Sequence, residues 1–490
     1  MKLHAIALAT LAVTAAGSAC AVRVTVTDAN RINMTGASAL RNSIAGTVYS
    51  DICAGATDIT LYNLTRPGGP GNAGSNPLPT ANFWGITCTL NTAFNGIAAG
   101  TPIAFFKSDQ GGSGQGVYPL IDPANLNKPQ VNVDTTQCTN PNVTVSGVST
   151  PNPAVADVQY TGCATDVAKI VHFGVSDIEP EQFIGADRPK DQSYNEALLQ
   201  NNDLNKSTVV QTVFAVAVNR NLYEALQTAQ GIAPTAACAL GATTDACLPS
   251  IGKAQAATFF AGFAADWSVL GVANPSNQIN ICRRVDGSGT QASSNRHLLT
   301  VNCNAAALSP ADVGFSSPAV APLSPTANAA TVSAYITANV KNTAGATFVF
   351  EGPGTGDVIS CLNQAQTVGG YGIGHVSREN AIGADWRHVR LDGVVPNRDN
   401  ARLGRYDYLF ESTIQYSAAT FNNPAKTNAN QQKFITGLTN VIGTSASLSR
   451  LSAAAQQGVI SASLAVPVGD PFGSRVSRNG NSCSPLTLVR

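Results

Sequence analysis

The segment Arg284-Val-Asp-Gly-Ser-Gly-Thr290 is the most informative stretch of the chain, because it offers a guanidinium, a carboxylate, two hydroxyl groups and closely spaced backbone N–H groups. A planar guanidinium can grip an oxyanion with two parallel hydrogen bonds, and glycines let backbone amides at a helix start approach the same anion. Asp286 would hold the Arg284 guanidinium in place. The pattern therefore suits a tetrahedral oxyanion, although Asp-Gly-Ser-Gly is also common in ordinary surface turns.

Three more polar turns each follow a short apolar segment. The turn 36–40 leads into a segment with apolar residues at helical spacing, and Ser38 is a candidate N-cap for that helix. The second turn, at 112–116, reads Gly-Ser-Gly-Gln-Gly, and the third ends an apolar strand, 170–176, at Asp177. In open α/β sheets ligands collect at the carboxyl ends of strands, so we expect these turns to share one site.

Strand-like and helix-like segments alternate along most of the chain, which favours an α/β architecture. The apolar run 209–218 predicts a buried strand, and 254–270 predicts a helix carrying several aromatic residues. Segments rich in small and polar residues predict loops or insertions at 66–80, 122–153 and 304–344.

The first 21 residues have the form of a secretory signal, with an apolar run at 5–16 and a small-x-small cleavage site. That run is too short to cross a bilayer. Cys20 raises the alternative of a lipid anchor, but the residues before it lack the large aliphatic side chain expected there. We therefore expect a soluble protein in the periplasm or outside the cell.

The chain has 11 cysteines, and removal of Cys20 with the signal would leave an even number. An even count in an exported chain predicts disulfides. No Cys-x-x-Cys or His-Glu-x-x-His pattern indicates a metal site. The spacing favours local pairs, although it cannot fix the connectivity: Cys53 with Cys88, Cys138 with Cys163, Cys238 with Cys247, Cys282 with Cys303, and Cys361 with Cys483.

A chain of 490 residues has room for two domains or one large two-lobed unit, and 44% hydrophobic residues suffice for ordinary cores. The formal net charge is zero and only 12% of residues are charged. This argues against nucleic acid and against electrostatic docking to membranes. A small anion is still possible, because local dipoles and one arginine can hold it without a net positive field.

In order and content, the four turns resemble those of the periplasmic phosphate-binding proteins of ABC import systems, a branch of the type II periplasmic binding protein fold. The Arg-x-Asp-Gly-Ser-Gly-Thr turn is the most specific part of the likeness, which covers most of residues 30–410. It includes a crossover strand, an aromatic-rich helix and two glycine-rich segments, at 214–219, 254–267, 352–357 and 369–375.

The resemblance implies a two-lobed α/β fold with disulfide-bonded insertions, in which 22–215 and 378–490 form lobe I and 216–377 forms lobe II. It implies a monomer, without enzymatic activity or cofactor, that binds phosphate between the lobes and delivers it to a transporter permease. Asp286 would orient Arg284. The residues implied to contact the anion are Ser38, the Ala39 amide, Ser113, Asp177, Arg284, Ser288, Gly289 and Thr290.

Asp177 gives this set its selectivity, because it is the one acceptor among donors. A carboxylate beside a fully deprotonated anion lacks a donor, whereas hydrogen phosphate supplies one. The chain departs from the family pattern where Ala39 and Leu40 replace an aromatic residue and a proline, which would widen the pocket. A cysteine-bearing insertion at 117–168 could cover the cleft.

Other readings are weaker. Ser250-x-x-Lys253 matches an acyl-transfer dyad without its companion motifs. The glycines of 112–116 form an imperfect dinucleotide fingerprint, but the prolines that follow deny it a long helix. His172 and His375 lie on apolar strands and are expected to be core or rim residues rather than catalysts. A different role on the same scaffold is an extracellular or surface protein that scavenges phosphate or contacts other proteins without feeding a transporter.

Overall fold

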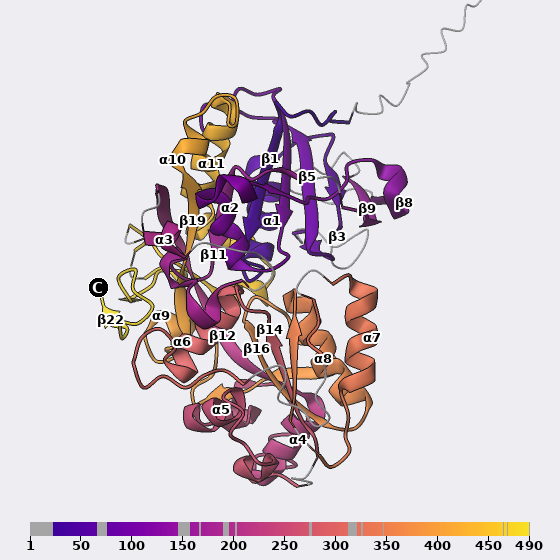
Figure 1. The fold of residues 1–490 in the computed structure, drawn as a ribbon, viewed down its shortest axis with the longest axis vertical. Helices are drawn as coiled ribbons and strands as arrows, with labels where there is room; N and C mark the ends of the chain where they lie inside the picture. The colour runs from indigo at the N-terminus through magenta and orange to yellow at the C-terminus, as the bar shows by residue number, and fades with distance from the viewer. Residues whose placement is uncertain are drawn as a thin grey trace, which may run out of the picture.

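The computed structural model describes most of the chain as an α/β molecule built around one large sheet (Figure 1). The predicted signal segment 1–21, including Cys20, lies outside the described residues, as do parts of the three predicted loop segments. The described residues are 23–65, 76–145, 157–165, 168–189, 196–200, 203–273, 277–311, 321–324, 327–345, 347–463, 465–467 and 469–489.

The sheet contains 14 strands, and all but two of them follow one another along a single path. Along that path the strands are β15 (Thr347–Gly352), β14 (Ile279–Arg284), β16 (Tyr371–Ser377), β12 (Leu204–Asn219), β19 (Leu409–Ser417), β11 (Phe173–Ser176), β1 (Arg31–Gly36), β6 (Pro102–Ser108), β5 (Phe83–Thr89), β2 (Thr60–Tyr62), β9 (Asp157–Cys163) and β8 (Cys138–Val145). Two further strands pair with β12 beside the path, β17 (Trp386–His388) and β20 (Val459–Ser461).

Strand β12 is shared by two parts of the sheet. It pairs with β19 up to Val213 and with β16 from Phe214 onward. We call the strands from β19 to β8 the first half and the strands β16, β14 and β15 the second half. In the first half β1 is parallel to β6 and β11, and in the second half β14 is parallel to β15 and β16. The predicted α/β class is confirmed, while the exact lobe boundaries at 215/216 and 377/378 stay predictions.

Helices cover the faces of both halves. In the second half, alternate residues of β15 face opposite ways: Val349 packs in the cluster that contains α5 and α6, whereas Phe348 and Phe350 pack with α7 and α8. A parallel sheet covered on both faces has this pattern. The helices are α1 (Arg41–Thr47), α2 (Tyr118–Ile121), α3 (Ala197–Gln200), α4 (Arg220–Ala229), α5 (Lys253–Phe260), α6 (Gly289–Leu299), α7 (Ala329–Asn339), α8 (Thr355–Thr367), α9 (Arg398–Arg402), α10 (Ala418–Phe421), α11 (Ala429–Val441) and α12 (Ser445–Ser449).

Two local predictions are wrong. The helix predicted over 254–270 ends at Phe260, because Gly262 adopts a left-handed backbone with φ +75°, and 267–270 forms a separate 3₁₀ turn. Ser38 is not an N-cap, since α1 begins at Arg41 without a side-chain cap. The Ser38 hydroxyl instead accepts a hydrogen bond from Arg284 across 246 residues of sequence, so a tertiary contact replaces the local one.

Five disulfides pair all ten cysteines of the described residues. The predicted Cys53–Cys88, Cys138–Cys163 and Cys238–Cys247 bonds are confirmed. The last two predicted pairs are wrong, because Cys282 on β14 bonds to Cys361 on the helix α8 that packs on this strand, which leaves Cys303 for Cys483. Such a disulfide content is typical of exported proteins.

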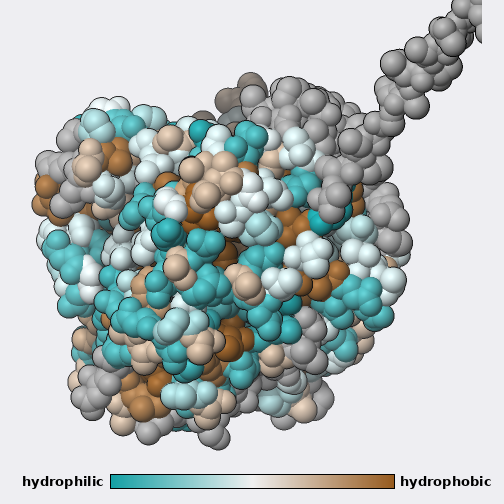
Figure 2. All heavy atoms as spheres, turned by 90° about the horizontal axis from the view of Figure 1, so that it is seen from above, coloured by the Kyte–Doolittle hydropathy of each residue, from teal (hydrophilic) through white to brown (hydrophobic). Residues whose placement is uncertain are grey.

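Hydrophobic and hydrophilic residues are mixed over the face seen in Figure 2, although grey atoms cover part of it. Within the part of the chain that the structure describes, no helix combines the length and apolar character needed to span a membrane. Nor do the described residues group three or more His, Cys, Asp or Glu side chains as a metal site would.

Candidate anion-binding site

The four turns singled out in the sequence lie together where the two halves meet. Three of them follow β1, β6 and β11, neighbouring strands of the first half. The fourth follows β14 and reaches them from the second half: the Gly114 N–H donates to the Gly287 carbonyl over 2.7 Å. The close packing of the two turns depends on glycine, because a Cβ on Gly112 would lie 2.6 Å from the Cα of Ser288.

Arg284 ends β14 and is buried, with 1% of its surface exposed. Two carbonyls that follow β15 fix its guanidinium, since Nε donates to Gly352 over 3.1 Å and Nη2 donates to Pro353 over 2.8 Å. The remaining nitrogen, Nη1, donates to the hydroxyls of Ser38 at 2.6 Å and Thr355 at 3.3 Å. Burial lowers the pKa of Arg284 to about 10, which still leaves it charged at neutral pH.

Asp177 follows β11 and is fully buried beside the fourth turn. Its backbone N–H donates to Ser113 Oγ over 3.1 Å, and its Oδ2 accepts from Thr290 Oγ1 at 3.3 Å. Its Oδ1 has no hydrogen-bond partner among the described residues. Burial raises the pKa of Asp177 to about 6, against the opposing charges of Arg284 and Lys107. A buried acceptor without a donor is costly, so this oxygen is the most unusual atom of the site.

The start of α6 faces Asp177. Ser288 is the N-cap of this helix, and its hydroxyl accepts from the Gln291 N–H at 3.4 Å. Gly289 comes so close to the first half that a Cβ there would lie 2.2 Å from Ser113 Oγ and 2.9 Å from Asp177 Oδ2. Helix starts favour negative charge, and only glycine fits at this contact.

A buried group of charged residues that was not predicted from the sequence lies behind the first two turns. Lys107 is fully buried, donates to the Ala37 carbonyl over 2.7 Å and is paired with Asp109. Asp109 also lies 3.2 Å from Arg41 Nη2 and accepts from Trp84 Nε1 at 2.7 Å. Burial lowers the pKa of Lys107, and Asp109 opposes that shift. These residues fix the first turn against the strand that leads into the second.

Thr355 was also missed. This first residue of α8 is buried, and its hydroxyl lies 2.9 Å from Ser38 Oγ, so a second helix start borders the site. The glycine-rich segment 352–357 was the available signal, because such a segment before a helix often approaches an anion. Thr355 and Ser38 form a direct hydroxyl contact between the halves.

The roles of two predicted site residues, Asp286 and Ala39, are not assigned by their contacts. Asp286 is largely buried, and its role in orienting Arg284 stays a prediction. Ala39 is buried, and its carbonyl is 3.5 Å from the Ser377 hydroxyl. Whether its amide contacts an anion also stays a prediction.

The rival motifs find no support in the geometry. The Ser250 hydroxyl accepts from the Gly393 N–H at 2.8 Å, and the Lys253 ammonium lies 3.8 Å from Asp407, so each has a partner other than its predicted dyad mate. The glycine turn at 112–116 is followed only by the four-residue helix α2. His172 and His375 are buried in the core, as predicted.

A separate pocket of about 400 Å³ lies at the opposite end of β1, between the 168–172 segment and the start of α11. Arg31, His172 and Lys426 are among its lining residues. None of the residues predicted to contact the anion lines this pocket.

No protein-family model matches the chain, and no curated protein sequence matches it. Among solved structures, it is similar to a protein described as a phosphate ABC transporter substrate-binding protein with bound phosphate from Clostridium perfringens, at 10% identity and a TM-score of 0.41, covering 89% of this chain and all of the other. It is also similar to an ABC-type phosphate transport receptor from Vibrio cholerae, at 12% identity and a TM-score of 0.27, covering 55% of this chain and 73% of the receptor.

A third similar structure is a phosphate-binding protein from Stenotrophomonas maltophilia, at 14% identity and a TM-score of 0.28, covering 51% of this chain and 65% of that one. At such identities and TM-scores the likeness assigns no ligand, which has to be inferred from the side chains of this chain.

Proposed function

We propose that this chain is an exported solute-binding protein that captures inorganic phosphate between the two halves of its sheet and delivers it to an ABC-type importer. In this proposal the halves act as the two lobes, 22–215 with 378–490 and 216–377, and Asp286 supports Arg284. The residues proposed to surround the anion, called the cage below, are Ser38, Ala39, Ser113, Asp177, Arg284, Ser288, Gly289 and Thr290.

The single observation that carries the proposal is the unpartnered Oδ1 of Asp177 in a fully buried place. The other groups proposed to surround the anion are mainly donors: the guanidinium of Arg284, the hydroxyls of Ser38 and Thr290, and the amides at the start of α6. An oxyanion needs donors, and a protonated oxyanion also needs one acceptor. Hydrogen phosphate meets both needs, whereas sulfate at neutral pH has no proton to offer Asp177.

The small number of cations near Asp177 is consistent with an anion of low charge. Arg284 and Lys107 both lie close enough to lower the pKa of Asp177, but burial outweighs them and raises that pKa to about 6. Lys107 is already paired with Asp109. Arg284 is therefore the cation we expect to face the anion directly, with hydroxyls and helix starts supplying the other contacts.

An alternative role keeps the same ligand and removes the transporter. A disulfide, Cys303–Cys483, ties the segment after α6 to the C-terminal segment. A receptor that passes its ligand on must open, and a covalent tie of this kind favours a protein that stores or scavenges phosphate outside the cell. A transporter permease encoded beside this gene would favour import, and recovery of the protein from culture medium would favour scavenging.

Calorimetric titration of the oxidised protein with phosphate, sulfate, arsenate and molybdate tests the proposal. Phosphate and arsenate should bind, because both carry a proton near neutral pH, and sulfate and molybdate should bind much more weakly. Equal affinity for phosphate and sulfate would reduce the proposal to a general oxyanion receptor. Binding of none of the four would overturn it.

A further inference from the structure

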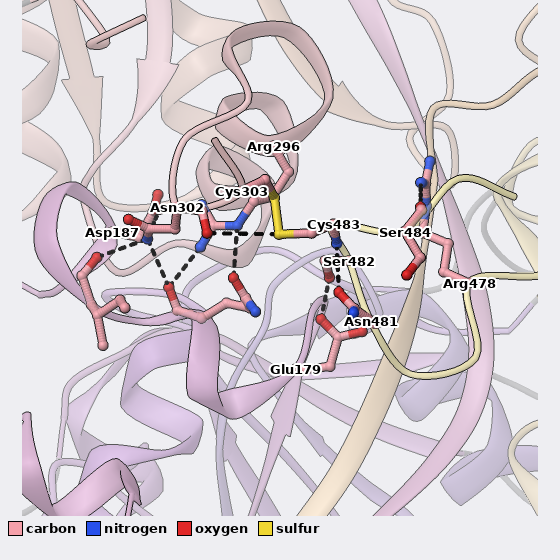
Figure 3. Close-up of a disulfide and its surroundings, with 12 residues drawn as sticks. Glu179, Asp187, Arg296, Asn302, Cys303, Arg478, Asn481, Ser482, Cys483 and Ser484 are labelled. Carbon is pink, nitrogen blue, oxygen red and sulfur yellow. Dashed lines mark hydrogen bonds and ion pairs between the residues drawn. A yellow bond between two sulfur atoms is a disulfide. The ribbon is translucent and has the colours of Figure 1, made fainter. Parts of the chain in front are cut away.

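The two halves are fastened together on the outer side of α6, away from the cage. Figure 3 shows the parts that meet there: the segment that follows Asp177, the far end of α6 and the C-terminal segment. We infer that Asp187, Arg296, Cys303 and Cys483, called the latch below, hold α6 against the Asp177 segment and so govern how fast the anion leaves the cage. The part of this inference that concerns release of the anion rests on the proposed function.

The first component of the latch is a buried ion pair. Arg296 of α6 is paired with Asp187, and each side chain is 1% exposed. The same guanidinium donates to the Gln182 carbonyl over 2.7 Å and to Gln182 Oε1 over 3.1 Å. One helix residue of the second half thus binds two residues of the 178–187 segment, which belongs to the first half.

Every oxygen of the Asp187 carboxylate is occupied. Oδ1 accepts from Asn295 Nδ2 at 2.7 Å, and Oδ2 accepts from both Arg296 and Asn302 Nδ2, the latter at 3.2 Å. The Asn302 amide also donates to the Ile184 carbonyl over 3.1 Å. A buried carboxylate with this set of donors is fixed in one arrangement, and separating the halves would leave its charge without partners.

The second component is covalent. Cys303, four residues beyond the end of α6, is bonded to Cys483 of the C-terminal segment. Ser482, the neighbour of this cysteine, donates to Glu179, which lies two residues after Asp177. The C-terminal segment is itself held to the first half, because Arg478 donates to the carbonyls of Leu409 and Asp407 over 3.2 and 2.8 Å.

The latch acts on the cage through a rigid element. Helix α6 begins at Gly289, which contacts Asp177 and Ser113, and carries Arg296 two turns later. A helix moves as one body, so its start cannot leave Asp177 far while its other end is held. Opening of the cage on this side therefore requires the latch to open, and anion release should be limited by that step.

The molecule offers a matched control for the disulfide. Cys138–Cys163 joins β8 to β9 within the first half, and its Cys163 is half-buried, as Cys303 is. The second cysteine of each bond differs, because Cys138 is buried and Cys483 is exposed. Removing the Cys138–Cys163 bond breaks a disulfide without freeing α6. The double variants Cys303→Ser with Cys483→Ser and Cys138→Ser with Cys163→Ser therefore differ in whether the halves are tied.

The test measures release and opening separately. Each protein is loaded with radiolabelled phosphate and chased with an excess of unlabelled phosphate, and hydrogen exchange is followed for the amides of 178–187 and 289–299. We expect the Cys303/Cys483 variant to release phosphate about ten-fold faster or more, with a smaller change in the association rate. Its two reporter segments should exchange faster, and the Cys138/Cys163 variant should match the unmodified protein.

A variant that folds poorly does not end the test, because the folded Cys138/Cys163 variant can be reduced with dithiothreitol to open Cys303–Cys483, whose Cys483 is exposed. Unchanged release and unchanged exchange after loss of Cys303–Cys483 would overturn the latch. If no variant binds phosphate and the unmodified protein does not bind it either, the proposed function is overturned. Faster hydrogen exchange after loss of Cys303–Cys483 would still support the inference that the latch holds α6 in place.

Discussion

The two halves of the molecule meet at two buried places, and each place contains an aspartate from the first half and an arginine from the second. In the latch, Asp187 and Arg296 pair directly and both carboxylate oxygens have donors. In the cage, Arg284 donates to carbonyls and hydroxyls, and Asp177 Oδ1 has no partner among the described residues.

The difference indicates separate tasks for similar residues. In the latch each charge faces an opposite charge directly, so this contact needs no ligand to balance it. In the cage the hydrogen bonds of Arg284 go to neutral groups, while the charges of Asp357, Asp177 and Asp109 raise its pKa against burial. The unpartnered carboxylate oxygen of Asp177 still needs a donor. The cage therefore has the properties of a binding site, and the latch has the properties of a structural contact that holds the two halves together.

The largest expected effect comes from removing the cationic member of the cage. Arg284→Ala should weaken phosphate binding by at least about 10³-fold, or about 4 kcal/mol, because a buried guanidinium supplies charge-assisted bonds that no neutral group replaces. Arg284→Lys should restore only part of the affinity, since an ammonium lacks the planar fork. Calorimetric titration measures both variants.

The control for this experiment is Arg220→Ala, which removes an exposed arginine that pairs with Glu224 on α4. It should bind phosphate as the unmodified protein does. The neighbouring Arg283 is unsuitable as a control, because it is buried and paired with Glu351. Unchanged affinity of Arg284→Ala would move the binding site elsewhere in the molecule.

In the latch, the corresponding substitution should cost stability. Arg296→Met leaves the buried charge of Asp187 without its cation, which should lower the free energy of unfolding by about 3–5 kcal/mol. Arg402→Met, which breaks a surface pair between the half-buried Arg402 and the exposed Asp399, should cost less than about 1 kcal/mol. Urea unfolding of both variants gives the comparison, and a loss below 1 kcal/mol for Arg296→Met would contradict the role of this pair.

The next effect is the dependence of stability on pH that comes from Asp177 of the cage. Burial raises the pKa of Asp177 from its ordinary 3.8 to about 6, so the folded protein holds this proton more tightly than the unfolded chain does. The resulting stability is present below about pH 3.8 and is lost as the pH rises to about 6, a difference of about 3 kcal/mol. Asp177→Asn cannot titrate and should lack this loss.

Urea unfolding without phosphate, at pH 4 and pH 7, measures this effect as the difference between the unmodified protein and Asp177→Asn. The variant should be the more stable of the two at pH 7 by an amount that it does not show at pH 4. If the difference between the proteins is the same at both pH values, Asp177 does not carry a raised pKa in the folded state.

The sequence predicted that the four turns lie together, which the structure confirms, but it predicted none of the latch contacts. The reason is physical. Glycines, hydroxyls and charges in a short turn constrain the local backbone, so the turn 284–290 could be recognised by itself. Asp187 and Arg296 are 109 residues apart, and each resembles an ordinary surface charge in its own segment. Their pairing depends on how two halves pack, which local spacing does not encode.

The same reason explains the other errors. Lys107 was missed because a lysine in a strand usually points to solvent, whereas here Asp109 and the Ala37 carbonyl satisfy it in the core. The last two disulfides were paired by closeness in sequence, although the packing of α8 on β14 brings Cys282 to Cys361. Local patterns predicted elements and turns, and contacts between elements decided the rest.

The smallest expected effect, and the sharpest for the ligand, is on the choice between phosphate and sulfate. Asp177→Asn keeps the size of the side chain but gives it an N–H₂ group that can donate to an unprotonated oxyanion. The ratio of the sulfate Kd to the phosphate Kd should therefore fall about ten-fold, because sulfate binds more tightly and phosphate binds more weakly.

Competitive titration of both anions against both proteins at fixed salt measures this change. Ser288→Ala is the contrasting variant, because it changes the cage at the start of α6 and leaves the acceptor Asp177 in place. It should weaken the binding of phosphate and of sulfate by the same factor. If Asp177→Asn also weakens both anions equally, the carboxylate acts on the fold of the cage rather than on the proton of the ligand. The unpartnered oxygen would then no longer distinguish phosphate from other oxyanions, and the proposed ligand would have to be widened accordingly.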